Sequence, residues 1–335
     1  MSQRDRFVTL AQAYGFNHVG FAPLSLTPHF ERYAKWIDAG HHGTMDYLAK
    51  NPDVREDPRL RLPNGASAVV LAMEYDHHRP PDPGGLTGKV AAYAWGRDYH
   101  NLIGKRLKKF KKQLFREGIT VWGGVDTAPI LERSWASQAG VGFNGKNSVQ
   151  ILPARGSFMF LSVLFVDVEI ESDTLLRDHC GSCTRCLDIC PTQAFNGPRS
   201  LDARKCIAYW TIEDPGPIPL ALREGFGRWF FGCDDCQTIC PHNVRPPHTQ
   251  EADFLPKHAW IDLEYILTAS EEDILSFFEG SPIRRPGAEG LRRNACVVLG
   301  NLKKPDAVPL LRRTADHGSA LVSEHARWAL EQLGG

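Results

Sequence analysis

Apolar and polar positions follow two different periods along the first 175 residues. Apolar runs at 67–75 and 157–170, each bounded by turn residues, predict two buried strands. Between them, the basic segment 101–117 places apolar side chains at helical spacing and stops at a glycine, which predicts an amphipathic helix. This mixture of strands and helices predicts an α/β domain over residues 1–175.

The rest of the chain has two different patterns. Residues 176–250 show little periodicity and several turns that end in proline, as expected of a small domain folded around metal-containing groups. Residues 251–335 are helical and contain a weak repeat, in which the segment around Ala326 matches the segment around Ala295 at an offset of 31 positions. We therefore expect a C-terminal α-helical domain of HEAT-like repeats.

Charge and hydropathy narrow the class of protein. The 335 residues carry 39 Lys and Arg against 39 Asp and Glu, so a charged partner has to be met by a local patch. The longest mostly apolar run, at 158–168, is too short to cross a bilayer. The N-terminal segment lacks the apolar stretch of a signal peptide. We expect a cytoplasmic protein with no membrane segment.

Nine cysteines in such a protein call for an explanation other than disulfides. Cys296 stands alone on the apolar side of a predicted helix, where a small buried hydrophobic side chain is expected. The other eight fall within 180–240. The first four have the spacing C-x2-C-x2-C-x3-C-P of a bacterial ferredoxin, which is highly specific for [4Fe–4S] clusters: Cys180, Cys183, Cys186 and Cys190.

A second, shorter run completes the set. Cys233, Cys236 and Cys240 repeat the end of the first motif, and Cys206 is available as the missing ligand. In two-cluster ferredoxins the fourth cysteine of each run binds the other cluster. We therefore assign one cluster to Cys180, Cys183, Cys186 and Cys240, and the other to Cys190, Cys206, Cys233 and Cys236. The alternative, two zinc sites, would use separated C-x2-C pairs.

Several blocks of sequence, taken in order, resemble the epoxyqueuosine reductase family. They include AWGRDYH at 94–100, VDTAPILERSWASQAGVGFNGKN at 125–147, CIAYWTIE at 206–213, FGCDDCQTICPHN at 231–243 and RRPGAEGLRRNACVVLGN at 284–301. These enzymes of tRNA queuosine modification depend on cobalamin and iron–sulfur clusters. The resemblance implies a nitroreductase-like cobalamin domain at 1–175, a ferredoxin-like domain at 176–250 and a HEAT-like tRNA-binding domain at 251–335.

The resemblance also implies a reaction and its residues. The epoxide of epoxyqueuosine, at the wobble position of tRNA, would be reduced to the alkene of queuosine by cobalamin that the two clusters reduce. Glu132, in the block DTAPILER, would be the acid that protonates the epoxide oxygen. The expected cobalamin contacts are Arg55, Arg97, Asp98, Tyr99, His100, Gly142, Gly145 and Lys146.

The segment 281–313 is expected to bind tRNA. It holds eight Lys and Arg against two acids, which is typical of a phosphate-binding surface. The candidate contacts are Arg284, Arg285, Arg292 and Arg293. The helix 101–117 is a second basic surface, although such a run is as often a solvated helix face.

Two other functions compete with this one. A cobalamin-dependent reductive dehalogenase acting on a small molecule would share both cofactors, but it would have no use for a basic helical tail. A simple electron carrier would not need 175 cysteine-free residues. An external low-potential donor, flavodoxin-like or ferredoxin-like, is expected to supply the electrons.

Overall fold

A four-stranded antiparallel sheet forms the centre of the N-terminal part in the computed structural model, which describes residues 2–334. Its strand order is β1-β2-β7-β4, with β1 at His18–Pro23, β2 at Ser67–Glu74, β7 at Met159–Val166 and β4 at Val121–Gly124. Every residue of β2 is buried, as expected of a central strand covered on both faces. The two strands predicted from the apolar runs are confirmed.

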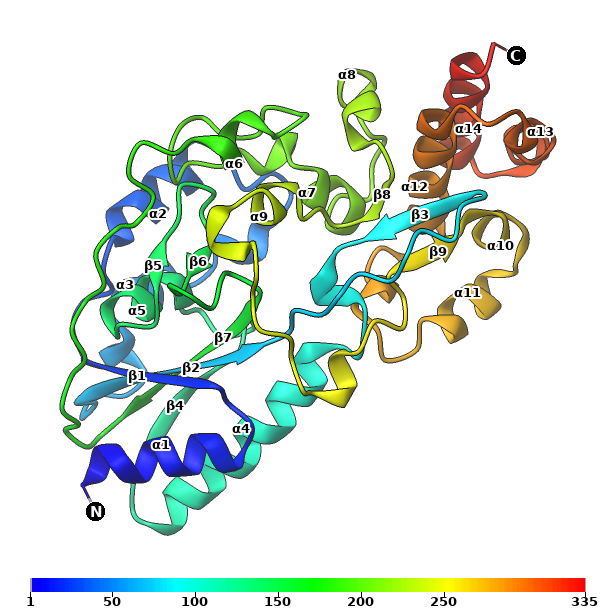
Figure 1. Cartoon of the computed structure of the whole chain (residues 1–335). Helices are drawn as coiled ribbons and strands as arrows, with labels where there is room; N and C mark the ends of the chain where they lie inside the picture. Colours follow the sequence, from blue (N-terminus) through cyan, green and yellow to red (C-terminus); the bar gives the residue numbers. More distant parts are fainter. Residues whose placement is uncertain (1, 335) are drawn as a thin grey trace.

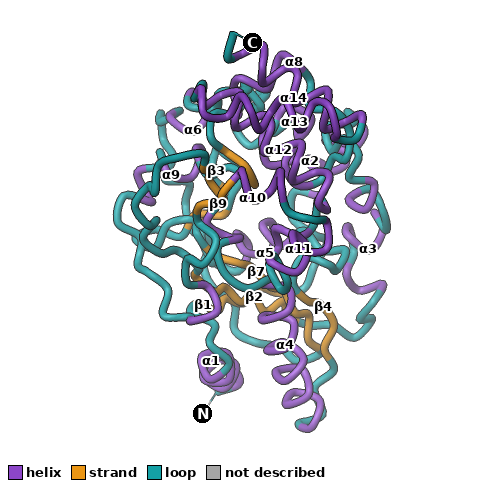
Figure 2. Tube along the Cα trace, turned by 90° about the vertical axis from the view of Figure 1, so that its right-hand side faces the viewer, coloured by secondary structure: helices purple, strands orange, loops and turns teal. Residues whose placement is uncertain are grey.

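Helices cover both faces of this sheet (Figures 1 and 2). On one face, α1 (Gln3–Ala13) and α4 (Tyr99–Arg116) pack their apolar sides against alternate residues of β2 and β7. On the other face, α5 (Glu132–Gln138) inserts the fully buried Trp135 against Phe165. The helix predicted at 101–117 is confirmed, and its four buried residues are Ile103, Leu107, Phe110 and Leu114.

Shorter elements surround the sheet. Helices α2 (Phe30–Asp38) and α3 (Pro52–Glu56) lie on the α5 side, and a small hairpin joins β5 (Phe143–Asn144) to β6 (Gln150–Ile151). The hairpin packs along α5, and its turn reaches the first turn of that helix, where the Arg133 guanidinium donates to the Ser148 carbonyl.

The cysteine segment consists of short helices and turns. Its elements are α6 (Arg185–Asp188), α7 (Ile207–Ile212), α8 (Leu220–Arg223), β8 (Trp229–Phe231) and α9 (Asp235–Thr238). Helices α6 and α9, which belong to the two cysteine runs, pack against each other. Only four residues long each, they depend on tertiary contacts rather than on helix propensity.

A second sheet joins all three parts of the chain. It has the order β8-β3-β9, with β3 at Thr87–Val90 and β9 at Trp260–Asp262. Strand β3 follows the Pro- and Gly-rich segment 77–86 and runs parallel to β8. One continuous apolar core therefore runs from the N-terminal part into the C-terminal helices.

Helices make up most of the C-terminal part (Figure 2). They are α10 (Leu263–Thr268), α11 (Glu271–Phe277), α12 (Gly287–Leu302), α13 (Val308–His317) and α14 (Ala320–Gln332). Helix α14 packs on both α12 and α13. Cys296 in α12 is fully buried, which confirms its expected role as a core side chain. Of the helices in residues 2–334, none has both the length and the apolar character needed to span a bilayer.

Candidate functional site

The first group of cysteine thiols comes from both cysteine runs. The pKa of the Cys186 thiol is raised, by burial first and then by the charges of three neighbouring thiols, those of Cys180, Cys240 and Cys183. Burial, and with it the charge of Cys183, raises the pKa of the Cys240 thiol. Cys240 therefore lies among the first three cysteines of the other run, as the crossed assignment requires.

The second group is centred on Cys206. Burial and then the charge of Cys190 raise the pKa of the Cys206 thiol. Cys206 contributes in the same direction, after burial, to the raised pKa values of Cys233 and Cys236. The four thiols assigned to the second cluster therefore lie close together. The charge of Cys186 also raises the pKa of the Cys236 thiol, so the two groups of thiols adjoin.

The arrangement differs from that of a single-ion site. Within the described residues, no three His, Cys, Asp or Glu side chains converge on one point where a metal ion could sit. A four-iron cluster makes no such demand, because each thiolate binds its own iron atom. Eight free thiols in two adjoining groups form a donor set that fits two such clusters.

The β5–β6 hairpin joins the first group of thiols to the sheet domain. Phe143 and Ile151 of the hairpin pack against Cys240. The ammonium group of Lys146 donates to the carbonyl of Gly181 at 2.7 Å, and its backbone N–H faces the Cys180 thiol. The Asn147 amide donates to the Cys236 carbonyl at 2.8 Å. This hairpin therefore lies between the clusters and the N-terminus of α5.

Three predicted cobalamin contacts belong to this hairpin. Gly142 has a positive φ of 83°, and a Cβ atom there would lie 2.4 Å from the carbonyl of Ile151. A Cβ atom on Gly145 would lie 2.5 Å from the Ile151 side chain. Both glycines are explained by hairpin packing, and Lys146 reaches toward the cysteine loop. A contact of these three residues with a corrin ring stays a prediction beside this structural role.

A charged network begins at the N-terminus of α4. The Asp98 carboxylate caps the helix by accepting the His100 backbone N–H, and it also accepts from the His100 ring at 2.8 Å. The other ring nitrogen of His100 donates to Asp126 at 2.7 Å, and the Tyr99 hydroxyl donates to the same oxygen at 2.7 Å. Because each nitrogen faces a carboxylate, both carry a proton and His100 is a cation.

The pKa values follow from this geometry. Burial lowers the pKa of His100, but the hydrogen bonds to Asp126 and Asp98 outweigh it and raise the pKa to about 9. Burial also opposes ionisation of Asp126, yet its bonds from His100 and Tyr99 keep its pKa below the ordinary value. Tyr99 is held in place by ring stacking, 4.2 Å from the centre of Phe160 and 4.0 Å from His100. A fixed negative charge is therefore maintained at Asp126.

Glu132 lies next to this charge, at the first position of α5. Burial, and after it the charge of Asp126, raise the pKa of Glu132 to about 7. Its Oε1 atom is buried without a hydrogen-bond partner within the described part of the chain. A carboxyl group that is half protonated near neutral pH and not otherwise engaged is suited to give a proton to a bound molecule.

Other buried polar atoms of α5 and the adjoining hairpin also lack partners among residues 2–334. They are Nε1 of Trp135, Oδ1 of Asn144 and Oγ of Ser148, on α5 and the adjoining hairpin. Buried donors and acceptors in native proteins are almost always satisfied, so a group left open points to a bound ligand or water. Together they offer both donors and acceptors to a polar molecule held between α5 and the hairpin. The amide groups around a corrin ring match this requirement.

The two predicted arginine contacts have other partners. Arg55 is buried, and its guanidinium donates to the carbonyls of Lys50 at 3.1 Å and Tyr47 at 3.2 Å. The guanidinium thus holds the segment 47–50, and a contact of Arg55 with a corrin stays a prediction. Arg97 is exposed and pairs with Asp253 at 3.8 Å, and its contact with a corrin stays a prediction.

The four predicted tRNA contacts do not form one surface. Arg293 is fully buried, and its guanidinium donates to the carbonyls of Asp214 and Gly216 at 2.7 and 2.6 Å. Arg293 therefore cannot bind phosphate, and it instead anchors α12 to the cysteine segment. The prediction failed because two adjacent arginines on a helix point in directions about 100° apart. Arg285, by contrast, is exposed and pairs with Glu213 at 2.8 Å.

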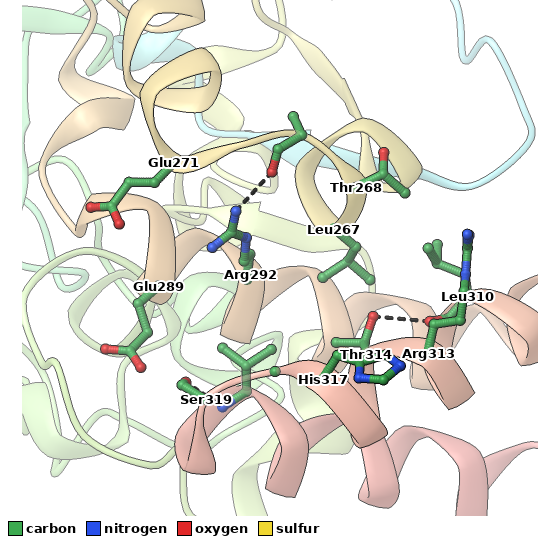
Figure 3. Close-up of a pocket in the computed structure, with 13 residues that line it drawn as sticks. Leu267, Thr268, Glu271, Glu289, Arg292, Leu310, Arg313, Thr314, His317 and Ser319 are labelled. Atoms are coloured by element: carbon green, nitrogen blue, oxygen red, sulfur yellow. Dashed lines mark hydrogen bonds between the residues drawn. The ribbon is translucent and has the colours of Figure 1, made fainter.

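Arg292 lines a hollow of about 680 Å³ between α10, α12, α13 and α14 (Figure 3). It donates to the Ala269 carbonyl at 2.7 Å, and Arg313 and His317 lie across the hollow. Glu271 and Glu289 line the same hollow, so its charge is mixed. Arg284 lines a neighbouring hollow with three glutamates of the 271–279 segment. The positive charge expected on the surface of 281–313 is thus partly neutralised by neighbouring glutamates, most of them in 271–279.

Sequence reasoning missed Asp126 beside the acid, and Glu213 and Tyr47 in the vicinity of Asp126. Asp126 belongs to the same block as Glu132, and its charge is the second cause of the raised Glu132 pKa. Glu213 closes the block CIAYWTIE and is paired with Arg285, whose guanidinium lies 5.7 Å from the centre of the Tyr47 ring. Asp126 is the one that a signal could have indicated, because an acid followed by Thr-x-Pro favours an exposed turn.

Comparison with known proteins agrees with this geometry. Residues 179–243 match a family model described as "4Fe-4S double cluster binding domain", and residues 55–127 match one described as "Epoxyqueuosine reductase QueG, DUF1730". The epoxyqueuosine reductase of Pseudomonas aeruginosa is 42% identical over 96% of this chain and 91% of its own length. That of Escherichia coli is 38% identical over 95% of this chain and 86% of its own.

Solved structures show the same relationship. A crystal structure of epoxyqueuosine reductase with an epoxyqueuosine-modified tRNA-Tyr stem loop superimposes with a TM-score of 0.93 at 27% identity, covering 99% of this chain and 90% of that one. The structure of the enzyme from Streptococcus thermophilus gives 0.89 at 29% identity, with the same coverage. This chain, with its double-cluster binding domain, therefore belongs to the epoxyqueuosine reductase family.

Proposed function

We propose that this chain reduces the epoxide of epoxyqueuosine in tRNA to the alkene of queuosine. Two electrons and two protons enter, the carbon–oxygen bonds of the epoxide break, and the oxygen leaves as water. The observation that carries this proposal is the unpartnered Glu132 carboxyl, with a pKa of about 7, in a fold that matches an epoxyqueuosine reductase bearing a modified tRNA stem loop.

The eight clustered cysteines would bind two [4Fe–4S] clusters in the crossed arrangement. The proximity of Cys240 to Cys183 and Cys186, and of Cys190 to Cys206, supports it. The first cluster would lie against the β5–β6 hairpin, whose other side reaches the residues around Glu132. Electrons would therefore leave the protein's redox centres from the cluster that includes Cys180 and Cys240.

Cobalamin would bind between α5 and the hairpin. The buried polar atoms of Trp135, Asn144 and Ser148 that have no partner among residues 2–334 are suited to hydrogen bonds with the amide groups of a corrin. Tyr99 and His100 both donate to Asp126. When bound and reduced, cobalamin supplies a strongly reducing, nucleophilic cobalt centre. The residues of the chain hold that group and the substrate together, exclude water and provide the proton.

Glu132 would hold the proton that the epoxide oxygen takes as its ring opens. Asp126 keeps that proton on Glu132 near neutral pH, since its negative charge disfavours a second carboxylate nearby. His100 and Asp98 in turn hold Asp126 ionised and in place. Loss of any member of this network should change the pH dependence of the reaction before it changes the fold.

The tRNA would reach this site from the side of the C-terminal helices. We propose that residues 251–335 form a HEAT-like tRNA-binding domain beside the cobalamin domain at 1–175 and the ferredoxin-like domain at 176–250. The pairing of α12 and α14, which carry the two copies of the repeat, supports the repeat assignment. Arg284, Arg285 and Arg292 remain the proposed phosphate contacts, and a flavodoxin-like or ferredoxin-like protein remains the proposed electron donor.

The test is an anaerobic incubation of reconstituted, reduced enzyme with tRNA that carries epoxyqueuosine. Mass spectrometry of the nucleosides should show loss of one oxygen atom. Iron analysis and EPR spectra of the same sample test the clusters, and its cobalamin content is measured after protein denaturation. A sample with clusters and cobalamin that leaves epoxyqueuosine unchanged would contradict the proposal.

A further inference from the structure

Arg79 is a cation enclosed by three tryptophan rings beside the second group of cysteines. Its guanidinium carbon lies 4.7, 5.4 and 5.7 Å from the ring centres of Trp95, Trp229 and Trp260. Burial lowers its pKa from the ordinary value of an arginine, but a guanidinium stays protonated at any pH at which the protein is folded. The chain therefore places a permanent positive charge, on a side chain that is 26% exposed, among aromatic rings.

The counter-ion of this charge is Asp234. The two side chains approach to 3.6 Å, and Asp234 is buried, with a carboxylate oxygen that accepts the Ala92 backbone N–H at 2.7 Å. Asp234 directly follows Cys233 in the sequence. Its negative charge is one of the causes, after burial, of the raised thiol pKa values of Cys233 and Cys236.

Because Arg79 is paired with Asp234, its positive charge opposes the effect of the Asp234 carboxylate on the cluster next to Cys233. Charges in such low-dielectric surroundings interact more strongly than in water. A [4Fe–4S] cluster takes up one electron on reduction and becomes more negative by one charge, so a nearby cation favours the reduced form and a nearby carboxylate opposes it. Net charge around a cluster is one of the properties that set its potential.

We propose that Arg79 raises the reduction potential of the cluster bound by Cys190, Cys206, Cys233 and Cys236, by offsetting Asp234 beside two of its ligands. The inference rests on the cluster assignment in the proposed function. Without Arg79, Asp234 would lose the cation that pairs with it, whereas Asp235 would keep the Lys89 ammonium group in its vicinity, over the Trp229 ring that donates to Asp235. The first cluster has Lys146 and Arg199 nearby and would not depend on Arg79.

A purely structural role for Arg79 makes a different prediction. Its guanidinium also donates to the carbonyls of Val90 at 3.0 Å and Ala259 at 3.3 Å, which holds β3 and β9 together. If that were all, Arg79→Lys and Arg79→Met would disturb the protein alike. If the charge matters, Arg79→Lys keeps the potential and Arg79→Met does not.

The test is an EPR-monitored redox titration of both clusters in the full-length, cluster-loaded protein at one fixed pH. We expect Arg79→Met to lower the midpoint potential of one cluster only, Arg79→Lys to stay near the wild type, and Asp234→Asn to shift the same cluster upward. The double variant Arg79→Met/Asp234→Asn should return toward the wild-type value.

Two results would overturn the inference: an unchanged potential in Arg79→Met, or equal shifts in Arg79→Met and Arg79→Lys. If Arg79→Met does not retain its clusters, Asp234→Asn decides, because an unchanged potential there would equally contradict it. Absence of two four-iron signals in the wild type would instead contradict the cluster assignment. The measurement needs no turnover, so it is independent of the substrate.

Discussion

Replacement of Glu132 by glutamine should remove the proton from the reaction while keeping the shape of the side chain. The raised pKa gives a magnitude. A carboxyl with the ordinary pKa of 4.5 is protonated in about one molecule in 300 at pH 7, whereas one with a pKa of about 7 is protonated in about half. The environment of Glu132 therefore increases the population of the acid form by roughly two orders of magnitude.

We expect Glu132→Gln to lower single-turnover rates on epoxyqueuosine tRNA by on the order of 10²- to 10⁴-fold, the usual contribution of a positioned acid. Glu132→Asp should retain part of the activity, because it keeps a carboxyl group at the same helix position. The wild-type rate should fall as the pH rises through about 7, since the acid form of Glu132 is then lost. The assay is rapid-quench mass spectrometry with pre-reduced enzyme.

The controls decide what a loss of activity means. Iron content, cobalamin content and tRNA affinity should be unchanged in Glu132→Gln. Turnover of this variant at the wild-type rate would refute the role of Glu132 and direct attention to Tyr99 and His100. Loss of cobalamin from the variant would show that Glu132 is a cofactor contact instead.

Other predictions follow from the same structure. Asp126→Asn removes the charge that raises the Glu132 pKa, so the descending limb of the pH–rate profile should move to lower pH, and an unmoved limb would exclude this coupling. The wild type should bind about eight iron atoms, and Cys296→Ser should bind as many. Cys240→Ala should lose the EPR signal of the cluster that holds Cys183 and Cys186. Equal loss of both EPR signals would contradict the crossed assignment. Neutralising Arg284 and Arg292 should flatten the salt dependence of tRNA binding by up to about two units of log–log slope, and an unaltered slope would place tRNA elsewhere, with the helix at 101–117 the next candidate. Arg293→Ala should instead destabilise the fold in denaturant unfolding, by about 1–3 kcal/mol for each buried carbonyl that it leaves without a donor.

The parts of the structure that depend on local pattern were predictable. The buried strands at 67–75 and 157–170 and the helix at 101–117 are visible as periods of two and 3.6, and the cysteine spacing indicated iron–sulfur clusters before any coordinates. The grouping of Cys240 with Cys183 and Cys186 follows from the geometry of that motif, in which the fourth cysteine extends away from its own cluster.

The parts that depend on long-range contacts were not predictable. Whether Arg293 faces solvent or the protein depends on which side of α12 the cysteine segment covers, and the sequence of α12 alone does not contain that information. The same holds for Arg55 and for Lys146, whose partners lie in loops. The Arg79–Asp234 pair joins residues 155 positions apart in the sequence (234 minus 79), so no local signal marks it.

The central claim is that this chain converts epoxyqueuosine to queuosine in tRNA, with Glu132 as the acid. The most direct measurement is mass spectrometry of nucleosides from epoxyqueuosine tRNA after anaerobic incubation with the reduced, cobalamin-loaded and cluster-loaded wild type, beside Glu132→Gln in the same state. The account predicts loss of one oxygen atom from the nucleoside with the wild type and a rate at least about 100-fold lower with the variant. Unchanged epoxyqueuosine with the loaded wild type, or equal conversion by both proteins, would contradict it.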